Sequence, residues 1–374
     1  GHSRGAGLVV ASGALAVGTF VAALVFGSSL AAMLSTPAAY GWPWDLAAMT
    51  GSGYGDLDVE AVNTTLEGRA DVASWSMLAI TSDVTVNGQP VQAVVPLDMR
   101  PGIDFTVVEG RLPRDADEVA LGTRTAADLG VGIGDKADLD GPVVGPRQVT
   151  VAGIAVIPPV GQFQADRAAP GLGMVLSPSI AEQEEVVGNM TFVGIDLVPG
   201  ADPRAVHTEL RDAILSWDTL GYPPFEYRGP VRPAEIVNVR SMRAVPLVVG
   251  GLLAASAAVG LAVSVLVSVR ARRRELGILR ALGFTGRQVG NSVRVQVLAT
   301  MLAALVIGVP LGLAAGRVVW RLFASQLGVA TEPSLPGGWI AATVLVSLLM
   351  AIVVAALPAR AAARIVPAAV LRQE

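Results

Sequence analysis

Few residues of this 374-residue chain could carry nucleophilic or metal chemistry. The sequence contains no Cys, which excludes thiolate nucleophiles, thiolate zinc sites and disulfides. It contains two His, and because His2 lies at the N-terminus, a Ser-His-Asp triad or a histidine metal site would depend on His207 alone. A surface or hydrogen-bonded histidine is the simpler interpretation of His207. We therefore expect no catalytic and no metal-binding residues of these kinds.

The motifs that bind phosphate or calcium are incomplete. Lys136 is the only lysine, and its surroundings at 132–137, Gly-Ile-Gly-Asp-Lys-Ala, lack the Gly-Lys-Ser/Thr ending of a phosphate-binding loop. A calcium loop beginning at Lys136 would end at Arg147, so both essential carboxylates are missing. The sequons that begin at Asn63 and Asn189 are weak signals and matter only in a secretory pathway. We expect the chain to bind no cofactor directly and not to be an enzyme that hydrolyses ATP.

The most distinctive polar stretch is residues 270–285, Arg-Ala-Arg-Arg-Arg-Glu-Leu-Gly-Ile-Leu-Arg-Ala-Leu-Gly-Phe-Thr. On an ideal helix its aliphatic residues share one arc, and Arg272 and Glu275 fall within that arc. A cytoplasmic helix lying on anionic lipid is one interpretation. An acid in the apolar face instead favours docking into a groove of a protein partner. Pairing of Glu275 with Arg272 is a third interpretation.

A second motif consists of glycines. Gly308, Gly312 and Gly316 recur every four residues, and Pro310 lies between them. Glycines at this spacing form a flat strip on which another helix packs closely. Pro310 removes one helical hydrogen bond and can kink the helix. The simpler expectation is that these residues serve close helix packing. The more specific expectation is that they form a hinge for ATP-driven motion.

The distribution of charge indicates a membrane protein. Charged residues make up 16% of the chain, against about 25% in an average soluble domain. Four stretches without charge are each long enough for a helix to cross a bilayer, which takes roughly 20 residues. We predict transmembrane helices near 8–33, 245–269, 295–316 and 339–358. No Asp, Glu, Lys or Arg lies within them, which argues against an ion- or proton-coupled carrier.

The charges of the loops predict an orientation. Residues 34–242 contain 13 Lys and Arg against 28 Asp and Glu, a net charge of −15, whereas the loop at 270–294 and the C-terminal tail are rich in Arg. Because short Arg-rich loops stay in the cytoplasm, we expect both termini inside a plasma (inner) membrane and residues 37–242 outside. Four tryptophans fall at predicted outer helix ends, where the headgroup layer favours such rings: Trp42, Trp44, Trp320 and Trp339.

The long segment between the first two spans predicts a folded α+β domain. The expected elements are helices at 57–68, 123–129 and 202–217, a hairpin at 84–95, and strands at 149–157 and 192–198. Asp202 followed by Pro203 is typical of a helix start, and Asn87-Gly88 is typical of a tight hairpin turn. The segment 234–245 has no clear break before the second span, so we expect a stiff helical connection there.

This layout and its motifs resemble one known family. One span, a large outer domain and three further spans, with Arg-Arg-Arg-Glu-Leu-Gly-Ile-Leu-Arg-Ala-Leu-Gly-Phe at 272–284, are similar to the FtsX/MacB-type ABC transporter permeases. The tail at 357–372 resembles the end of that family's last span. Glu-Gly-Arg-Leu-Pro at 109–113 and Asp-Glu-Val-Ala-Leu-Gly at 117–122 resemble its MacB-like extracytoplasmic module. The resemblance divides the chain into a first span at 1–36, an extracytoplasmic domain at 37–242 and an FtsX-like permease domain at 243–374.

The resemblance implies a function in which ATP, with magnesium, is hydrolysed by a separate or fused ABC ATPase. That ATPase docks on a coupling helix after the second span, and its motion passes through the spans to the outer domain. By position, the docking role falls on Arg272, Arg273, Arg274, Glu275, Leu276, Gly277, Leu279, Arg280 and Gly283. The family works with two four-span units, in one chain or as a dimer. The missing initiator Met favours one unit of a larger permease, such as the second.

Three functions remain open at this point. The first is an ABC permease subunit or half that drives export, extraction or mechanotransmission, with lipid, a cell-envelope protein, a lipoprotein or a peptide as further partners, and no nucleic acid. The second is a membrane-anchored scaffold or sensor whose outer domain binds a cell-envelope partner without transport. The third is an anchored enzyme on the outer face that uses carboxylates alone, for which the 28 acids at 34–242 are available.

Overall fold

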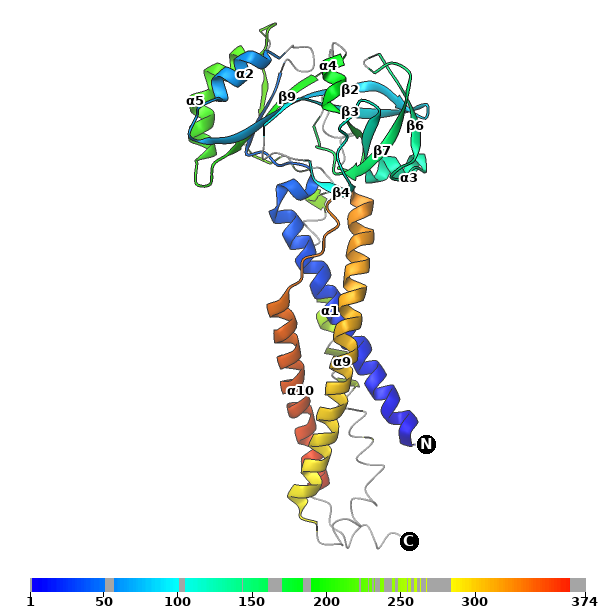
Figure 1. The fold of residues 1–374 in the computed structure, drawn as a ribbon. Helices are drawn as coiled ribbons and strands as arrows, with labels where there is room; N and C mark the ends of the chain where they lie inside the picture. The colour runs from blue at the N-terminus through cyan, green and yellow to red at the C-terminus, as the bar shows by residue number, and fades with distance from the viewer. Residues whose placement is uncertain are drawn as a thin grey trace. The chain divides into compact units, whose positions relative to one another are not determined.

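Figure 1 shows the fold in a computed structural model of the chain. The residues described are 2–50, 57–100, 105–142, 144–160, 170–183, 190–221, 223–227, 229–230, 232, 236–238, 244–245, 248–253, 255–256, 259–260, 263, 267 and 284–363. The chain forms two compact units. We call residues 1–31, 242–320 and 333–374 the span unit, and residues 32–241 and 321–332 the sheet unit.

Long apolar helices make up the span unit: α1 (His2–Ser35), α9 (Gly286–Leu327) and α10 (Gly337–Ala363). Val9–Ser35 and Gly286–Leu327 are long and apolar enough to cross a membrane, and the apolar part of α10 covers Gly337–Val353. The described residues of the second predicted span, such as 248–253, are helical. Long apolar helices therefore occupy the first, third and fourth predicted spans, and four complete crossings stay a prediction.

Hydroxyl side chains inside these helices bond to the backbone of their own helix. Thr19 donates to the Leu15 carbonyl at 2.9 Å, Thr300 to Gln296 at 2.9 Å and Thr343 to Trp339 at 2.8 Å. In hydrocarbon an unsatisfied polar group costs several kcal/mol, on the order of a lost hydrogen bond or more. These short side chains therefore fit an apolar helix without a partner from another helix.

The sheet unit is built on one mixed sheet whose strand order, among the described residues, is β10-β1-β9-β2-β3-β8-β5-β7-β4, with β6 pairing with β2 and β7. The strands are β1 (Leu46–Met49), β2 (Val72–Val86), β3 (Gln89–Met99), β4 (Val107–Gly110), β5 (Glu118–Gly122), β6 (Lys136–Asp140), β7 (Arg147–Ala155), β8 (Met174–Leu176), β9 (Met190–Leu197) and β10 (Phe225–Tyr227). The helices are η1 (Pro37–Tyr40), α2 (Val59–Leu66), α3 (Thr123–Leu129), α4 (Pro178–Gln183) and α5 (Pro203–Ser216). The pairs β3–β8 and β5–β7 are parallel, and the other pairs are antiparallel.

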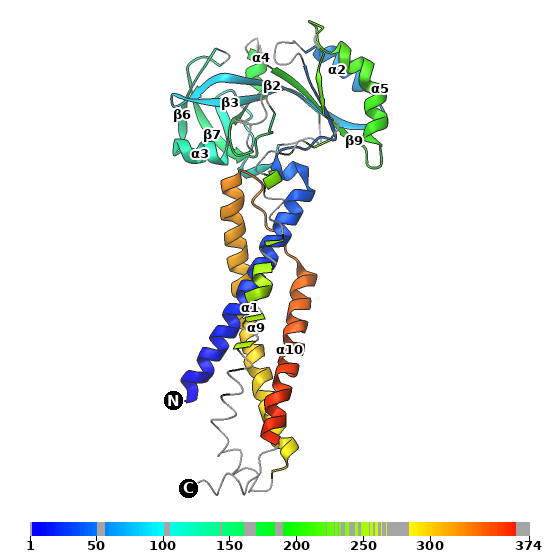
Figure 2. The same ribbon diagram turned by 180° about the vertical axis from the view of Figure 1, so that it is seen from behind.

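Among the described residues, two hydrophobic cores lie along this sheet, and β2 contributes to both. Its N-terminal part supplies Trp75 and Met77 to a core that also contains residues of α2 and α5. Its C-terminal part supplies Val84 and Val86 to a core with β5, β6 and β7. Figures 1 and 2 show α2 and α5 together near β9, and α3 near β6 and β7. The long strand β2 therefore joins two separately packed halves of the unit.

Local sequence signals predicted several of these elements. The expected hairpin is confirmed, because Asn87 and Gly88 adopt φ values of 51° and 74°, as a turn that follows strand twist requires. The helix at 123–129 ends at Gly130, which has φ 67°, and α5 starts where Asp202 accepts a hydrogen bond from the Arg204 N–H at 3.0 Å. Most of the expected connection at 234–245 lies outside the described residues.

The end of α9 belongs to the sheet unit. Residues 321–332 lie within the predicted permease domain at 243–374, and they pack with the sheet unit. The physical reason is the end of α9: Gly328 has φ 73°, and Val329 donates back to the Ala324 carbonyl at 3.1 Å. The chain leaves the helix there and Val329 becomes fully buried.

Candidate functional site

The glycines at 308, 312 and 316 bring the backbones of α1 and α9 into direct contact. A Cβ placed on Gly312 would lie 2.5 Å from the Gly18 carbonyl oxygen, and one placed on Gly308 would lie 2.6 Å from that of Ala14. A Cβ on Gly316 would lie 2.8 Å from the Val25 Cβ. We call Gly308, Gly312 and Gly316, together with Gly18, the glycine seam. Side chains at these positions would force the helices apart.

Pro310 does not interrupt this arrangement. It lies within α9, which is helical from Gly286 to Leu327, and its side chain is exposed rather than turned into the seam. The seam extends towards the end of the span unit through an edge-to-face contact of Phe26 with Trp320, at 5.8 Å between ring centroids. The glycines thus serve packing in this structure, and the hinge stays a prediction.

Three of the four tryptophans expected at the headgroup layer are buried in protein, so that interpretation was wrong for them. Trp320 is 1% exposed beside Phe26. Trp42 and Trp44 pack on Phe192 in the sheet unit, and the Trp44 indole donates to the Ser76 hydroxyl at 2.8 Å. Aromatic rings gain from burial in a protein core as they do at a membrane interface. Trp339 alone of the four is largely exposed, at 69%.

Within the sheet unit, the segments that follow α1 and α9 bind the same group of loops. Ala330 donates its N–H to the Ala39 carbonyl at 2.9 Å, and the Thr106 hydroxyl donates to Ala38 at 2.8 Å. Gly328 lies directly against the backbone of Gly171, with no room for a Cβ. We call residues 38–41, Thr106, Gly171 and residues 328–330 the junction. It is made largely of backbone, which favours a fixed geometry.

Tyr40 extends the junction. Its phenol is fully buried. Burial raises the pKa of Tyr40, and the nearby Arg232 guanidinium acts in the opposite direction. Arg232 belongs to the segment that leads towards the second predicted span. Three segments of the sheet unit therefore come together around η1: the one after α1, the one after α9 and the one that contains Arg232.

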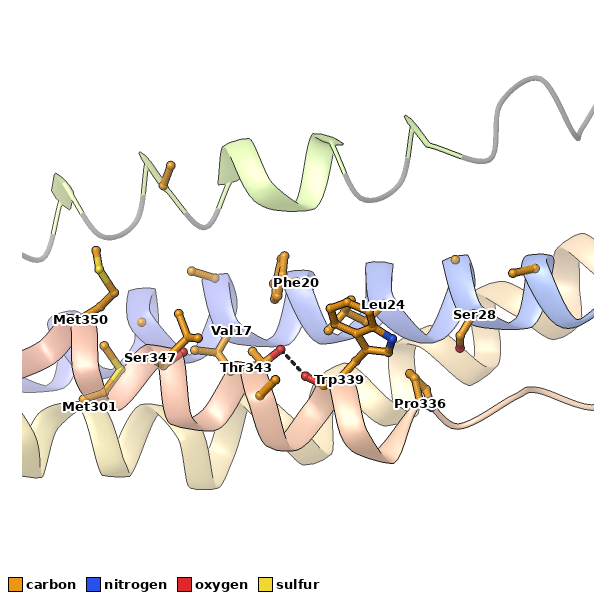
Figure 3. A pocket seen from close by; sticks show the side chains of 17 residues that line it. Val17, Phe20, Leu24, Ser28, Met301, Pro336, Trp339, Thr343, Ser347 and Met350 are labelled. Carbon is orange, nitrogen blue, oxygen red and sulfur yellow. Dashed lines mark hydrogen bonds between the residues drawn. The ribbon is translucent and has the colours of Figure 1, made fainter.

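A cavity of about 840 Å³ in the span unit is lined mainly by α1 and α10, and also by Met301 of α9 and by Ala255. Figure 3 shows Val17, Phe20 and Leu24 of α1 opposite Trp339, Thr343 and Met350 of α10. We call this cavity the slot. Its lining residues are Gly13, Ala16, Val17, Phe20, Leu24, Gly27, Ser28, Ala31, Ala255, Met301, Pro336, Trp339, Ala342, Thr343, Val346, Ser347 and Met350.

At one end of the slot the chain before α10 is tied to α1. The Ser28 hydroxyl donates to the Ser334 carbonyl at 2.9 Å, and the Ser334 N–H donates to the Ser29 hydroxyl at 3.0 Å. Ser28 lines the slot, and Ser29 is buried beside it. These bonds fix how α10 begins relative to α1.

The predicted ATPase-docking residues lie outside the described residues. They are Arg272, Arg273, Arg274, Glu275, Leu276, Gly277, Leu279, Arg280 and Gly283. The described chain resumes at Phe284, and α9 starts two residues later. The Thr285 N–H donates to the Gln288 side-chain oxygen at 2.8 Å, and Gln288 N–H donates to the Thr285 hydroxyl at 3.4 Å. This reciprocal cap, readable as Thr-x-x-Gln, separates the docking segment from the span and was missed in the sequence.

The remaining candidate groups have structural partners. His207 is buried and pairs with Glu226 across α5 and β10. The Asn63 side chain accepts from the Trp75 indole at 2.8 Å and donates to Asp98 at 3.1 Å, so this sequon position is engaged inside the domain. Among the described residues, no three His, Asp or Glu side chains form a group that could hold a metal ion.

Comparison with known proteins gives one match that bears on function. Residues 247–367 match the family described as FtsX-like permease C-terminal. None of the curated proteins matches the chain. A crystal structure of a domain from a Porphyromonas gingivalis protein, provisionally classed as a permease, aligns with 52% of this chain and 94% of its own length, at 13% identity and a TM-score of 0.32. That likeness is too low to carry an argument.

The family match covers the second predicted span, the docking segment, α9 and α10. The matched residues include Gly308, Gly312 and Gly316 and the Arg-rich stretch at 270–285. Residues 247–367 are therefore similar to the C-terminal domain of FtsX-like permeases.

Proposed function

We propose that this protein is an ABC transporter permease subunit, or one half of a permease, that couples a cytoplasmic ATPase to its outer domain. The observation that carries the proposal is the family match at 247–367, which includes α9 and its glycines. The matched part contains both the docking segment and the helix that packs on α1. A displacement of α9 would reach α1 because their backbones touch at Gly312 and Gly18.

In this proposal the sheet unit receives the motion through the junction. Backbone contacts at Gly171 and Gly328, and the bond from Ala330 to Ala39, hold the segments after α1 and α9 on one set of loops. Backbone is stiffer than side chains, so a shift of either segment would move the loops rather than be absorbed. The outer domain would then transmit force or reshape a site for a cell-envelope partner.

The ATPase partner would bind the segment at 272–283 and would hold ATP and magnesium itself. Glu275 lies among aliphatic residues of that segment and is the residue we expect to meet a basic group of the partner. The lack of a phosphate-binding loop in this chain supports a division of labour in which hydrolysis takes place on the partner.

The test is co-purification of the native complex in detergent, read by mass spectrometry and by ATPase activity. We expect a stoichiometric ABC ATPase with the unaltered protein and at least a tenfold loss of bound ATPase with Glu275→Arg. Glu67→Arg makes the same charge change at an exposed position of the sheet unit and should retain the ATPase.

Two results would contradict the proposal in different ways. If Glu275→Arg binds the ATPase fully and retains full activity, the docking role assigned to Glu275 is wrong, but the permease proposal still holds. No ATPase in any sample would favour the membrane-anchored scaffold, with residues 270–285 lying on lipid.

A further inference from the structure

A histidine and a carboxylate tie α5 to strand β10 inside the sheet unit. On α5, Val206, Leu210 and Ile214 recur every four residues and enter the core, and His207 lies on the same face, three residues before Leu210. The His207 side chain is 5% exposed, and its Nε2 bonds to the carboxylate of Glu226, which is 19% exposed. Because burying either group without a partner costs free energy, each stabilises the other where α5 and β10 pack.

Strand β10 is a short edge strand that depends on such contacts. It is three residues long, and among the described strands it pairs with β1 alone. Glu226 lies opposite Ala48 of β1, whose side chain belongs to the core beneath α5. Two short paired strands are marginally stable by themselves, so side-chain contacts decide how firmly β10 is held.

The chain leaves the sheet from β10. In the order of the described elements, β10 is the last strand before the second predicted span near 245–269. Five residues after Tyr227, Arg232 acts on the phenol of Tyr40 in η1, beside the junction. A change in how firmly β10 is held would therefore reach the junction through a short stretch of chain.

The strength of the bond between His207 and Glu226 depends on the charge of the imidazole. Histidine is the side chain whose charge ordinarily changes between about pH 5 and 8, whereas carboxylates ordinarily stay ionised above about pH 5. A protonated imidazole forms a charge-assisted hydrogen bond, which is about twice as strong as the bond from a neutral ring N–H. The bond should therefore strengthen as the pH falls from 8 to 5.5.

We propose that His207 and Glu226 form a proton-sensitive latch, which holds β10 firmly on α5 when His207 is protonated and loosely when it is neutral. Because residues 37–242 are predicted to lie outside the membrane, the latch would respond to the pH there. The inference goes beyond the proposed function, since it concerns the sheet unit alone and requires no ATPase.

The other charged side chains around α5 are exposed or have partners of their own. Glu209 pairs with Arg69, and Asp58 accepts a hydrogen bond from the Ala61 N–H at 2.9 Å. Strands β1, β2 and β9 present apolar side chains to this core. The remaining charged residues of α2, α5 and the turn after α5 are exposed or bonded to backbone: Glu60, Arg204, Arg211, Asp212 and Asp218. In the described part of the chain, Glu226 is thus the charged group that faces His207.

A second titratable pair lies near this edge of the sheet. Asp196 follows Ile195 on β9, and because Ile195 faces the core, Asp196 points to the opposite face of the sheet. Burial raises the pKa of Asp196, and the charge of Asp45 and a hydrogen bond with its side chain act in the same direction. Protonation of Asp196 would also relieve repulsion at low pH, so the test must separate it from His207.

The first measurement uses the unaltered full chain in nanodiscs. The chain contains two His, and His2 lies at the N-terminus, so histidine labelled with ¹³C at Cε1 reports His207 directly by NMR. We expect its ring signal to titrate between pH 5 and 8. Amide hydrogen exchange of peptides that contain 225–227, corrected for the pH dependence of intrinsic exchange, should be about fivefold faster at pH 8 than at pH 5.5.

Two variants separate the latch from the carboxyl pair. His207→Gln keeps a side-chain N–H for Glu226 at every pH, so β10 should stay protected while the pH dependence of exchange is lost. Asp196→Asn removes the other titration and should retain the fivefold change. Because the NMR titration uses the unaltered protein, it tests the latch even where His207→Gln does not fold.

Three results would overturn the proposal. A His207 ring signal that stays constant from pH 5 to 8 would show that this imidazole gains no proton in the range. Equal corrected exchange at pH 5.5 and 8 in the unaltered protein would show that its charge does not hold β10. A pH dependence that persists in His207→Gln, or that disappears in Asp196→Asn, would assign the proton-sensitive group elsewhere.

Discussion

The span unit and the sheet unit hold their elements together by opposite means. In the sheet unit large side chains fill two cores, with Trp217, Met77 and Leu121 fully buried. In the span unit α1 and α9 make close backbone contact at glycines, where side chains are absent. Lipid tails are as apolar as leucine, so association in a membrane depends on shape, whereas burial from water drives a soluble core. Removing side-chain volume should therefore destabilise the sheet unit, and adding side-chain volume at the glycines should destabilise the span unit.

The largest effect is expected from removing volume in the sheet unit. Trp217 is fully buried, and its indole donates to the Thr65 hydroxyl at 3.4 Å. Trp217→Ala should reduce the free energy of unfolding by about 3–5 kcal/mol, because a cavity is left in the core. Chemical unfolding of the detergent-solubilised protein, followed by circular dichroism, measures it. Leu220→Ala, at a side chain that is 62% exposed, should change little; equal losses would contradict the packing argument.

At the glycine seam, adding side-chain volume should reduce stability. Gly312→Val places methyl groups against the Gly18 carbonyl and Val21, and we expect a loss of about 1–3 kcal/mol together with reduced ATPase-coupled activity. Thermal unfolding in nanodiscs checks the stability. Gly7→Val is the control, because a Cβ at Gly7 meets no described atom within 4 Å. If Gly312→Val behaves like Gly7→Val, the seam does not hold α1 and α9 together.

The smallest effect is expected from a surface ion pair of the sheet unit. The Glu118 carboxylate accepts hydrogen bonds from the Arg111 guanidinium and from the Arg114 N–H, and these lower its pKa to about 2. A lowered pKa contributes stability that is present above the usual value near 4.5 and is lost as the pH falls towards 2. Glu118→Gln should therefore destabilise the protein slightly at pH 6 and not at pH 2. Unfolding midpoints at both pH values measure this, and a difference independent of pH would contradict it.

Sequence reasoning was most successful where the signal was local. The hairpin at Asn87-Gly88 and the helix starting at Asp202 depend on backbone preferences and caps within a few residues. The absence of charge from long stretches likewise predicted α1, α9 and α10 without knowledge of their contacts. Short strands such as β8 and β10, three residues each, were not predicted, because pairing with distant strands creates them.

For the candidate site too, the sequence predicted local features but not the contacts between distant residues. The spacing of Gly308, Gly312 and Gly316 predicted a close helix contact, but it did not identify α1 as the helix that touches them. The tryptophans were misread because an aromatic ring gains from a protein core and from a membrane interface alike. Nothing in the spacing of Gly13 to Ala31 distinguishes a face that meets protein from a face that borders a cavity.

The sequence by itself determined which segments avoid water, where helices and turns begin, and that residues 270–285 form a basic segment with an acid in its apolar arc. These properties arise from charge and backbone preferences over a few residues. Only the tertiary structure decided that the backbone of α1 contacts that of α9, that the segments after both helices meet at the junction, and that a slot lies between α1 and α10. Those outcomes depend on which distant surfaces fit one another, and fit is a property of side-chain volume in three dimensions.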